Sequence, residues 1–176
     1  MIYNLHRALF WFLVPIALVA INDTGAYIFG RLFGRLITEA PFLSLSPKKT
    51  WEGFLGGGIV TVAISYALPA LLRLFLDEKK WRYLTCGALD FIENADACTV
   101  PADFLDIEGL RWHVVAIAAY ASIVGPFGGF YASALKRAHG VKDFGNFIPG
   151  HGGLWDRLDC QFLVAAYTAA HVGAFL

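Results

Sequence analysis

The sequence predicts an all-α membrane protein, a polytopic helical bundle with about four transmembrane segments and a polar site at its cytoplasmic face. Of its 176 residues, 57% are apolar and 16% are charged. A soluble domain carries about 25% charged residues, so the composition favours a membrane protein. The net charge is zero, which argues against nucleic acid as a partner. We therefore expect a single membrane-embedded domain over residues 1–176.

The first two predicted spans are apolar runs long enough to cross about 30 Å of hydrocarbon. The first covers about residues 8–33, and membrane helices tolerate a proline such as Pro15. The second covers 54–76. It follows a polar loop in which Ser46 before Pro47 is a candidate N-cap.

The third and fourth predicted spans cover residues 113–135 and 158–176, and the pair Gly125-Pro126 predicts a break in the third. Before the third span, residues 77–112 carry eight carboxylates and four cations. This acidic segment has no sustained periodicity, so we expect a loop with one short helix. A bundle of four spans leaves helix faces uncovered, which leaves room for a homodimer.

The predicted topology places two polar loops on the same side of the membrane. If the second and third spans both cross, the loop at 34–53 and the loop at 136–157 face one compartment and can meet. These two loops and their flanking residues carry more cations than the acidic segment on the other side. The positive-inside rule therefore assigns the side of the two loops to the cytoplasm. The cations on this side are Arg31, Arg35, Lys48, Lys49, Lys136, Arg137, Lys142 and Arg157.

The glycines and cysteines predict packing and free thiols. Three glycine pairs at a spacing of four favour close helix packing without chemistry: Gly30 and Gly34, Gly53 and Gly57, Gly125 and Gly129. The three cysteines form no zinc or disulfide pattern. Cys86 and Cys98 could pair in an oxidising lumen, but free thiols are favoured.

The densest charge lies at residues 133–159. Ionisable groups near hydrocarbon are costly unless they have a function. Cations suit phosphate oxygens and carboxylates suit Mg²⁺, so the run predicts a metal-dependent phosphate site at a membrane surface. The candidate catalytic residues are Lys136, Arg137, Lys142, Asp143, His151, Asp156, Arg157 and Asp159.

The carboxylates of this run are candidate metal ligands. Asp156 and Asp159 are three residues apart at the start of a helix, so both can lie on one face and hold Mg²⁺. The alternative is an N-cap aspartate followed by an acid that favours the helix dipole. Asp143 is the third candidate. Lys136 and Arg137 have an alternative of their own, as a cationic flank that meets anionic lipid.

Candidate substrate-binding residues lie both upstream and within this run. Asn22 and Asp23 fall inside or at the edge of the first span, where a carboxylate suggests a function and a plain interfacial position is the alternative. The polar loop adds hydroxyl and carboxylate groups that a lipid-facing flank does not require. The full set is Asn22, Asp23, Ser46, Lys48, Lys49, Thr50, Glu52, Ser133, Gly152 and Gly153.

These motifs resemble the phosphatidate cytidylyltransferase family, also called CDP-diacylglycerol synthases. The resemblance covers about half of the chain. The Gly125–Phe130 stretch is similar to the eukaryotic branch. The main signature reads Ser133-x-x-Lys136-Arg137, then Lys142-Asp143, then Pro149-x-His151-Gly152-Gly153-x-x-Asp156-Arg157-x-Asp159, and two further blocks begin at Asn22 and Ser46.

The resemblance implies an Mg²⁺-dependent nucleotidyltransferase that makes CDP-diacylglycerol and pyrophosphate from CTP and phosphatidic acid in phospholipid biosynthesis. It implies an integral protein of the lipid bilayer, in the endoplasmic reticulum with a cytoplasmic active site. Asp156 and Asp159 would hold Mg²⁺, assisted by Asp143 or Asp23. His151 with its two glycines would shape the nucleotide pocket. The cations of these motifs would bind the triphosphate and the phosphatidate head group: Lys48, Lys49, Lys136, Arg137, Lys142 and Arg157.

Two departures and several alternatives accompany the resemblance. Bacterial relatives have an acidic residue where Gly129 stands, so a third metal ligand must come from elsewhere. The chain is also shorter than family members usually are, which is expected of a fragment, a truncated gene model or a minimal form. A CTP-dependent polyprenol or lipid kinase, a non-catalytic membrane remnant and a transporter are the competing functions.

Overall fold

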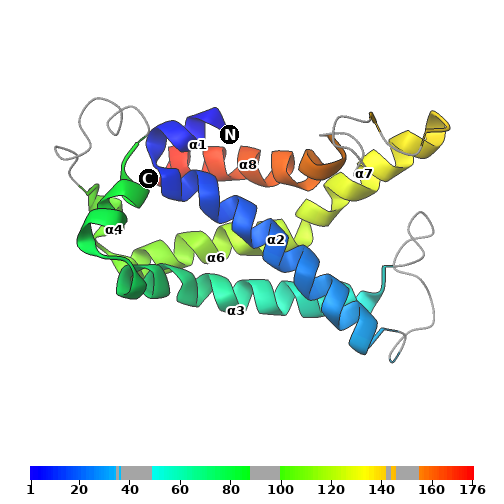
Figure 1. Ribbon diagram of the computed structural model, residues 1–176, viewed down its shortest axis with the longest axis horizontal. Helices are drawn as coiled ribbons and strands as arrows, with labels where there is room; N and C mark the ends of the chain where they lie inside the picture. The colour runs from blue at the N-terminus through cyan, green and yellow to red at the C-terminus, as the bar shows by residue number, and fades with distance from the viewer. Residues whose placement is uncertain (35, 37–48, 88–99, 142–143, 146–154) are drawn as a thin grey trace.

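The computed structural model describes residues 1–34, 36, 49–87, 100–141, 144–145 and 155–176, of which 155–157 by their backbone. This part of the chain is helical and contains no strand, which confirms the predicted all-α class. Figure 1 shows the helices arranged as an elongated bundle. They are α1 (Ile2–Arg7), α2 (Leu9–Leu32), α3 (Trp51–Phe75), α4 (Glu78–Thr85), η1 (Ala102–Phe104, a 3₁₀-helix), α6 (Ile107–Ile123), α7 (Gly125–Ala138) and α8 (Trp155–Phe175).

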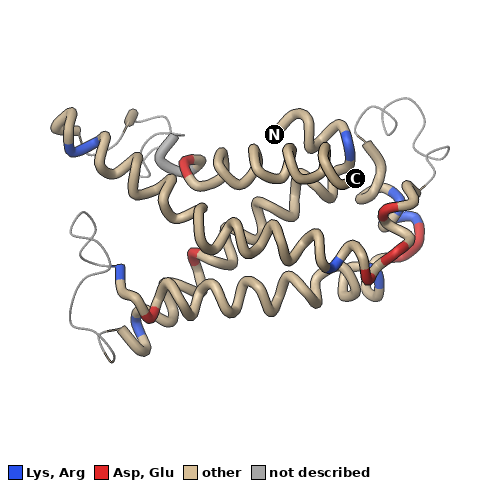
Figure 2. The backbone as a smooth tube through the Cα atoms, turned by 180° about the vertical axis from the view of Figure 1, so that it is seen from behind, with Lys and Arg blue, Asp and Glu red and all other residues tan. Residues whose placement is uncertain are grey.

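Three stretches of the described chain are long and apolar enough to cross a membrane: Leu9–Leu32, Trp51–Phe75 and Ile107–Ala138. They coincide with the first three predicted spans. The fourth predicted span corresponds to helix α8, whose 21 residues extend about 30 Å, but α8 is not one of these three stretches, so its crossing of the membrane stays a prediction. Charged residues gather at the two ends of the bundle (Figure 2), as expected of helices that pass through hydrocarbon.

Helix α3 begins three residues earlier than predicted because Thr50 caps it. The Gly53 N–H donates to Thr50 Oγ1 at 3.2 Å, and the Thr50 backbone is extended, as an N-cap requires. Thr50 is therefore the N-cap of α3, and the N-cap predicted at Ser46 stays a prediction. Ser46 and Pro47 lie outside the described residues.

The third predicted span is a pair of helices. The chain breaks between α6 and α7 at Val124, so the predicted interruption at Gly125-Pro126 is confirmed. Pro126 stands in the first turn of α7, where its missing N–H costs no hydrogen bond. Helix α6 starts at Ile107, earlier than predicted, because an Asp106 carboxylate oxygen accepts the Glu108 N–H at 3.1 Å.

Helices α2 and α3 are in backbone contact along the predicted glycine positions. A Cβ on Gly57 would lie 2.8 Å from the Ala26 nitrogen and 2.9 Å from the Asn22 carbonyl oxygen. A Cβ on Gly25 would lie 3.1 Å from the Gly57 Cα. We call this contact the glycine seam. It lets the polar residues late in α2 lie beside the start of α3.

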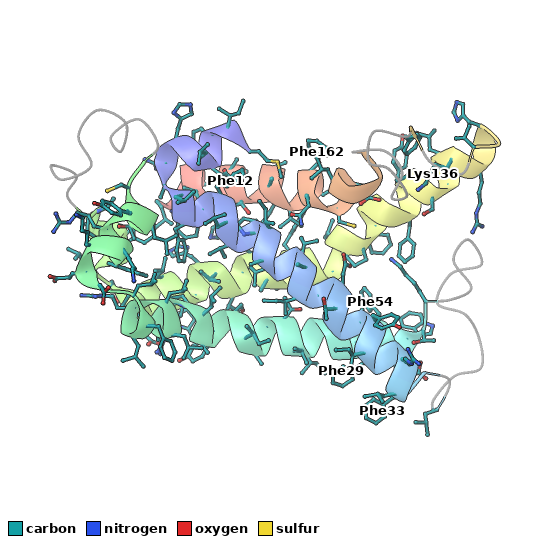
Figure 3. The ribbon with its side chains drawn as sticks, in the orientation of Figure 1. Phe12, Phe29, Phe33, Phe54, Lys136 and Phe162 are labelled. Atoms are coloured by element: carbon teal, nitrogen blue, oxygen red, sulfur yellow. The ribbon has the colours of Figure 1, made fainter. Side chains whose placement is uncertain are left out.

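Aromatic rings complete the packing of both helices at this end. The Phe29 and Phe33 ring centroids lie 5.6 Å apart at the end of α2 (Figure 3). Gly56 of α3 leaves the space that the Phe29 ring occupies. The start of α3 is therefore held against α2 by both glycine contacts and an aromatic side chain.

Helix α8 packs on α6 through aromatic side chains. The Tyr120 and Tyr167 rings stack with centroids 4.0 Å apart and planes within 3°. One turn further, His113 Nδ1 lies 3.0 Å from His171 Nε2. These contacts set the position of α8 and hence of Asp159 near its beginning.

An aromatic cluster closes the opposite end of the bundle. Phe10 lies edge-on to Trp11, Trp81 and Phe104, at centroid distances of 5.0, 6.4 and 5.3 Å. The described part of the acidic segment thus contributes two short helices, α4 and η1, where we expected one. Cys86 is disulfide-bonded, so the expected free thiol is wrong for this residue, and Cys98 lies outside the described residues.

Candidate functional site

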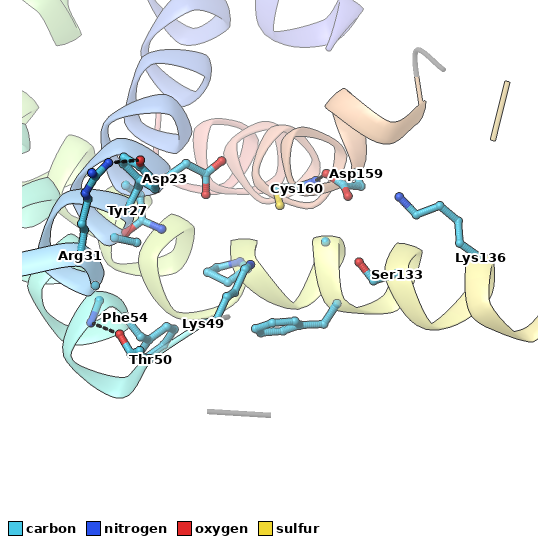
Figure 4. A pocket seen from close by; sticks show the side chains of 17 residues that line it. Asp23, Tyr27, Arg31, Lys49, Thr50, Phe54, Ser133, Lys136, Asp159 and Cys160 are labelled. Atoms are coloured by element: carbon cyan, nitrogen blue, oxygen red, sulfur yellow. Dashed lines mark hydrogen bonds between the residues drawn. The ribbon is translucent and has the colours of Figure 1, made fainter. Parts of the chain in front are cut away.

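A polar cavity of about 630 Å³ lies between α2, the start of α3, α7 and α8 (Figure 4). Its volume is within the range of about 300 to 1,000 Å³ that small-molecule sites occupy. The lining residues are Asn22, Asp23, Ala26, Tyr27, Gly30, Arg31, Lys49, Thr50, Gly53, Phe54, Pro126, Gly129, Phe130, Ser133, Lys136, Asp159 and Cys160.

Helix α2 presents a carboxylate, a phenol and a guanidinium to this cavity. Asp23, Tyr27 and Arg31 follow one another at intervals of four residues, so they share one helix face. Arg31 Nη1 donates to the Tyr27 hydroxyl oxygen at 3.1 Å (Figure 4). That hydrogen bond orients the guanidinium, a group suited to bind phosphate oxygens in pairs.

Lys49 reaches across the cavity toward α7. Its ammonium lies 4.3 Å from the centroid of the Phe130 ring. The same ammonium interacts electrostatically with the Asp23 carboxylate. Attraction to an aromatic face holds a cation without neutralising its charge. Lys49 is thus positioned over the cavity with its positive charge available to an anion.

Helix α7 contributes a second lysine and a hydroxyl. Lys136 Nζ lies 5.6 Å from the centroid of the Phe144 ring, and Ser133 stands one turn before it. With Arg31 and Lys49, the cavity has three described cations that come from three parts of the chain. Such a cluster suits a ligand with several phosphate oxygens.

Asp159 faces the same cavity from α8. Its Oδ1 accepts the Cys160 N–H at 2.7 Å, and its charge interacts with that of Asp23. A Cβ at Gly129 would lie 3.5 Å from Asp159 Oδ2. Gly129 therefore lies directly beside Asp159.

Two carboxylates from different helices, Asp23 and Asp159, thus face one cavity. Hard carboxylate oxygens are the donors that Mg²⁺ prefers. Among the described side chains there is no group of three metal-binding residues. Helix α8 starts at Trp155, so Asp156 is its second residue and is not the N-cap.

The structure brings together predicted site residues that are far apart in the sequence. The loops at 34–53 and 136–157 were expected to meet, and the described residues that flank them line one cavity. Predicted residues on the cavity are Asn22, Asp23, Lys49, Thr50, Ser133, Lys136 and Asp159.

Other predicted residues lie elsewhere or outside the described part. Glu52 is buried in the first turn of α3 and Arg137 is exposed near the end of α7, and neither lines the cavity. Their contact with substrate stays a prediction. Outside the described residues or side chains are Ser46, Lys48, Lys142, Asp143, His151, Gly152, Gly153, Asp156 and Arg157.

Asn22 has a packing role in addition to its place on the cavity wall. Its side chain is 4% exposed, and its Oδ1 accepts a hydrogen bond from Thr61 Oγ1 at 3.4 Å. The Gly57 carbonyl oxygen shares the single hydrogen of this hydroxyl and is the nearer acceptor, at 2.7 Å. The amide therefore links the glycine seam to the site.

Phe130 and Cys160 both line the cavity, and neither was among the predicted site residues. Phe130 lies four residues after Pro126 and three before Ser133, on the same face of α7. Helical periodicity counted from Pro126, in the first turn of α7, would have identified Phe130. Nothing in the sequence marks Cys160, except that it follows Asp159.

Known proteins are similar in sequence to this chain over nearly its whole length. A model of the cytidylyltransferase family matches residues 1–175. Phosphatidate cytidylyltransferase 1 of Arabidopsis thaliana is 39% identical over 98% of the chain, which covers 43% of that protein. Phosphatidate cytidylyltransferase 2 is 39% identical in Homo sapiens and 37% in Mus musculus, over 99% of the chain and 42% of each relative.

The chain spans less than half the length of these relatives. The matched region nevertheless contains every helix that lines the cavity and both motif-bearing regions that meet there. Because the family model matches residues 1–175 and the relatives are 37–39% identical, the chain belongs to the cytidylyltransferase family.

Proposed function

We propose that the chain transfers the cytidylyl group of CTP to phosphatidic acid. A phosphate oxygen of the lipid attacks the α-phosphorus of CTP, the bond to the bridging oxygen of the β-phosphate breaks, and pyrophosphate leaves. The cavity supports this proposal because its three cations and two carboxylates suit phosphate groups and their counterions. The matched relatives are named for this reaction.

The protein's own groups would mainly position reactants and offset negative charge. Lys49 and Arg31, from the α2–α3 side, face Lys136 of α7 across the cavity. A ligand that carries several phosphates can contact both sides at once. This arrangement favours two phosphate-bearing substrates held in one site.

Mg²⁺ is part of the proposal. Asp159 and Asp156 would hold it, with Asp23 or Asp143 as a further ligand. Gly129 removes the acid that bacterial relatives place beside Asp159, whereas Asp23 faces the same cavity from α2. Bound there, Mg²⁺ would offset the charge of the phosphate oxygens.

The proposed reaction is tested by measuring pyrophosphate release from CTP, with purified protein, Mg²⁺ and phosphatidic acid in detergent micelles. We expect release that requires the lipid. The substitution Lys49→Met removes a cavity cation at similar length and should lower turnover about a hundredfold. Lys80→Met, in exposed α4 at the opposite end, should leave turnover unchanged. Release of CDP without pyrophosphate would contradict the proposal and indicate a lipid kinase.

We also propose that the site faces the cytoplasm from the endoplasmic reticulum membrane. The polar loops at 34–53 and 136–157 and their flanking residues carry eight Lys and Arg residues against four in the segment 77–112, and cationic loops stay in the cytoplasm. The disulfide-bonded Cys86 belongs to the opposite end, and disulfides persist in an oxidising lumen. Both observations favour the same orientation.

Two matched cysteine variants test this orientation. Leu36 is 72% exposed near the cavity end, and Leu105 is 71% exposed at the other. In sealed microsomes, a membrane-impermeant maleimide should label Leu36→Cys at once and Leu105→Cys only after detergent is added. The unsubstituted protein supplies the background from Cys160. The reverse order of labelling would refute the orientation.

A further inference from the structure

A second cavity, of about 700 Å³, lies between α7 and α8. We call it the apolar groove. Its wall consists almost entirely of apolar side chains, from the opposite face of α7, from Phe144 and from the start of α8. The large ones are Phe127, Tyr131, Leu135, Phe144, Phe162 and Leu163.

Helix α7 separates the apolar groove from the polar cavity. Gly129, Phe130 and Ser133 face the polar cavity, whereas Phe127, Tyr131 and Leu135 face the groove. The two sets alternate with helical periodicity. One helix therefore has a polar ligand site on one side and an apolar site on the other.

Asp159 is common to both walls. Helices α7 and α8 approach closely here, since a Cβ on Gly128 would lie 2.7 Å from the Asp159 carbonyl oxygen. The start of α8 is thus the point at which the polar and apolar sites adjoin. A molecule with a charged head in the polar cavity has an apolar surface directly beside that head.

The apolar groove is open at the outer surface of the bundle. Phe162 and Leu163 are 41% and 37% exposed, and Phe162 stands on the outer side of α8 (Figure 3). Tyr131 of α7 is 72% exposed. In a membrane this surface meets hydrocarbon, so an acyl chain can enter the groove without crossing water.

We propose that the apolar groove between α7 and α8 binds an acyl chain of the lipid substrate while its phosphate occupies the polar cavity. The inference rests on the proposed function for the identity of the head group. It makes Leu163 and Phe162 determinants of acyl-chain recognition. Because the chain moves from one apolar environment into another, the groove would select acyl chains by how well they pack and not by their transfer from water.

Photocrosslinking tests the groove without relying on turnover. The probe is phosphatidic acid with a diazirine on one acyl chain, added to the full chain in nanodiscs, and mass spectrometry maps the adducts. We expect adducts concentrated on α7 and α8 around the groove. Leu163→Trp fills part of the groove, and the steric crowding should raise the probe concentration for half-maximal crosslinking about tenfold. Leu71→Trp is the control, since Leu71 lies on α3 and is similarly exposed at 44%.

The possible results separate the groove from the reaction. Adducts spread evenly over exposed helix faces, or equal effects of both tryptophan variants, would overturn the groove proposal. Loss of self-association in Leu163→Trp with unchanged crosslinking would assign the groove to a second copy of the chain and would also overturn it. Groove-confined adducts without pyrophosphate release would support the groove and contradict the proposed transferase.

Discussion

Replacing Asp159 with asparagine should lower the rate of pyrophosphate release at least about a hundredfold. The change removes one negative charge and preserves the shape of the side chain. An asparagine oxygen can still accept the Cys160 N–H that Asp159 accepts at 2.7 Å. The loss should therefore come from the missing charge and not from a displaced helix. The Mg²⁺ concentration for half-maximal activity should rise as well.

Asp103→Asn is the matched control for this variant. Asp103 lies in η1 among the acidic residues of the opposite end, so its substitution should change neither the rate nor the Mg²⁺ dependence. Circular dichroism would verify that both variants remain helical. A fully active Asp159→Asn protein with an unchanged Mg²⁺ requirement would refute the role of Asp159 as a metal ligand.

Replacing Gly57 with alanine should destabilise the protein by about 3 kcal/mol. The new Cβ would lie 2.8 Å from the Ala26 nitrogen and 2.9 Å from the Asn22 oxygen. Both neighbours are backbone atoms, which cannot rotate away, so α2 and α3 must separate. Because Asp23 and Lys49 lie on opposite sides of this contact, turnover should fall about a hundredfold.

Gly58→Ala is the control that separates the steric clash at Gly57 from the general effect of replacing a glycine of α3 with alanine. A Cβ on Gly58 would lie 3.5 Å from the Ser122 Cβ, an ordinary contact distance. Thermal unfolding in detergent should therefore show a large decrease in Tm for Gly57→Ala and almost none for Gly58→Ala. Equal decreases would mean that the glycine seam does not limit how closely the helices approach.

Much of the architecture follows from composition and helical spacing. The apolar runs locate α2, α3, α6 with α7, and α8, because only long helices satisfy backbone groups in hydrocarbon. The Gly53-Gly57 spacing predicts the glycine seam. Because the second and third spans run in opposite directions, the residues that flank the two polar loops lie at the same end of the bundle. Described residues from both regions line one cavity, which confirms that they meet.

Other features depend on contacts between residues far apart in the chain. Glu52 belongs to a polar motif yet is buried, since the rotation of α3 about its axis is set by its packing on α2. Lys49 lies over Phe130 only because α7 turns away from α6 at Val124. The disulfide bond of Cys86 is a contact that no local sequence pattern encodes.

The two faces of α7 have a consequence for how concentration controls this protein. Under the proposed function, the nucleotide would enter the polar cavity from water and an acyl chain of the lipid would enter the apolar groove from the bilayer, so neither substrate would have to leave its own phase. The relevant abundance of the lipid is then its mole fraction in the surrounding bilayer, whereas that of the nucleotide is its bulk concentration. Diluting the lipid with other lipids should slow the reaction as effectively as withdrawing the nucleotide from solution.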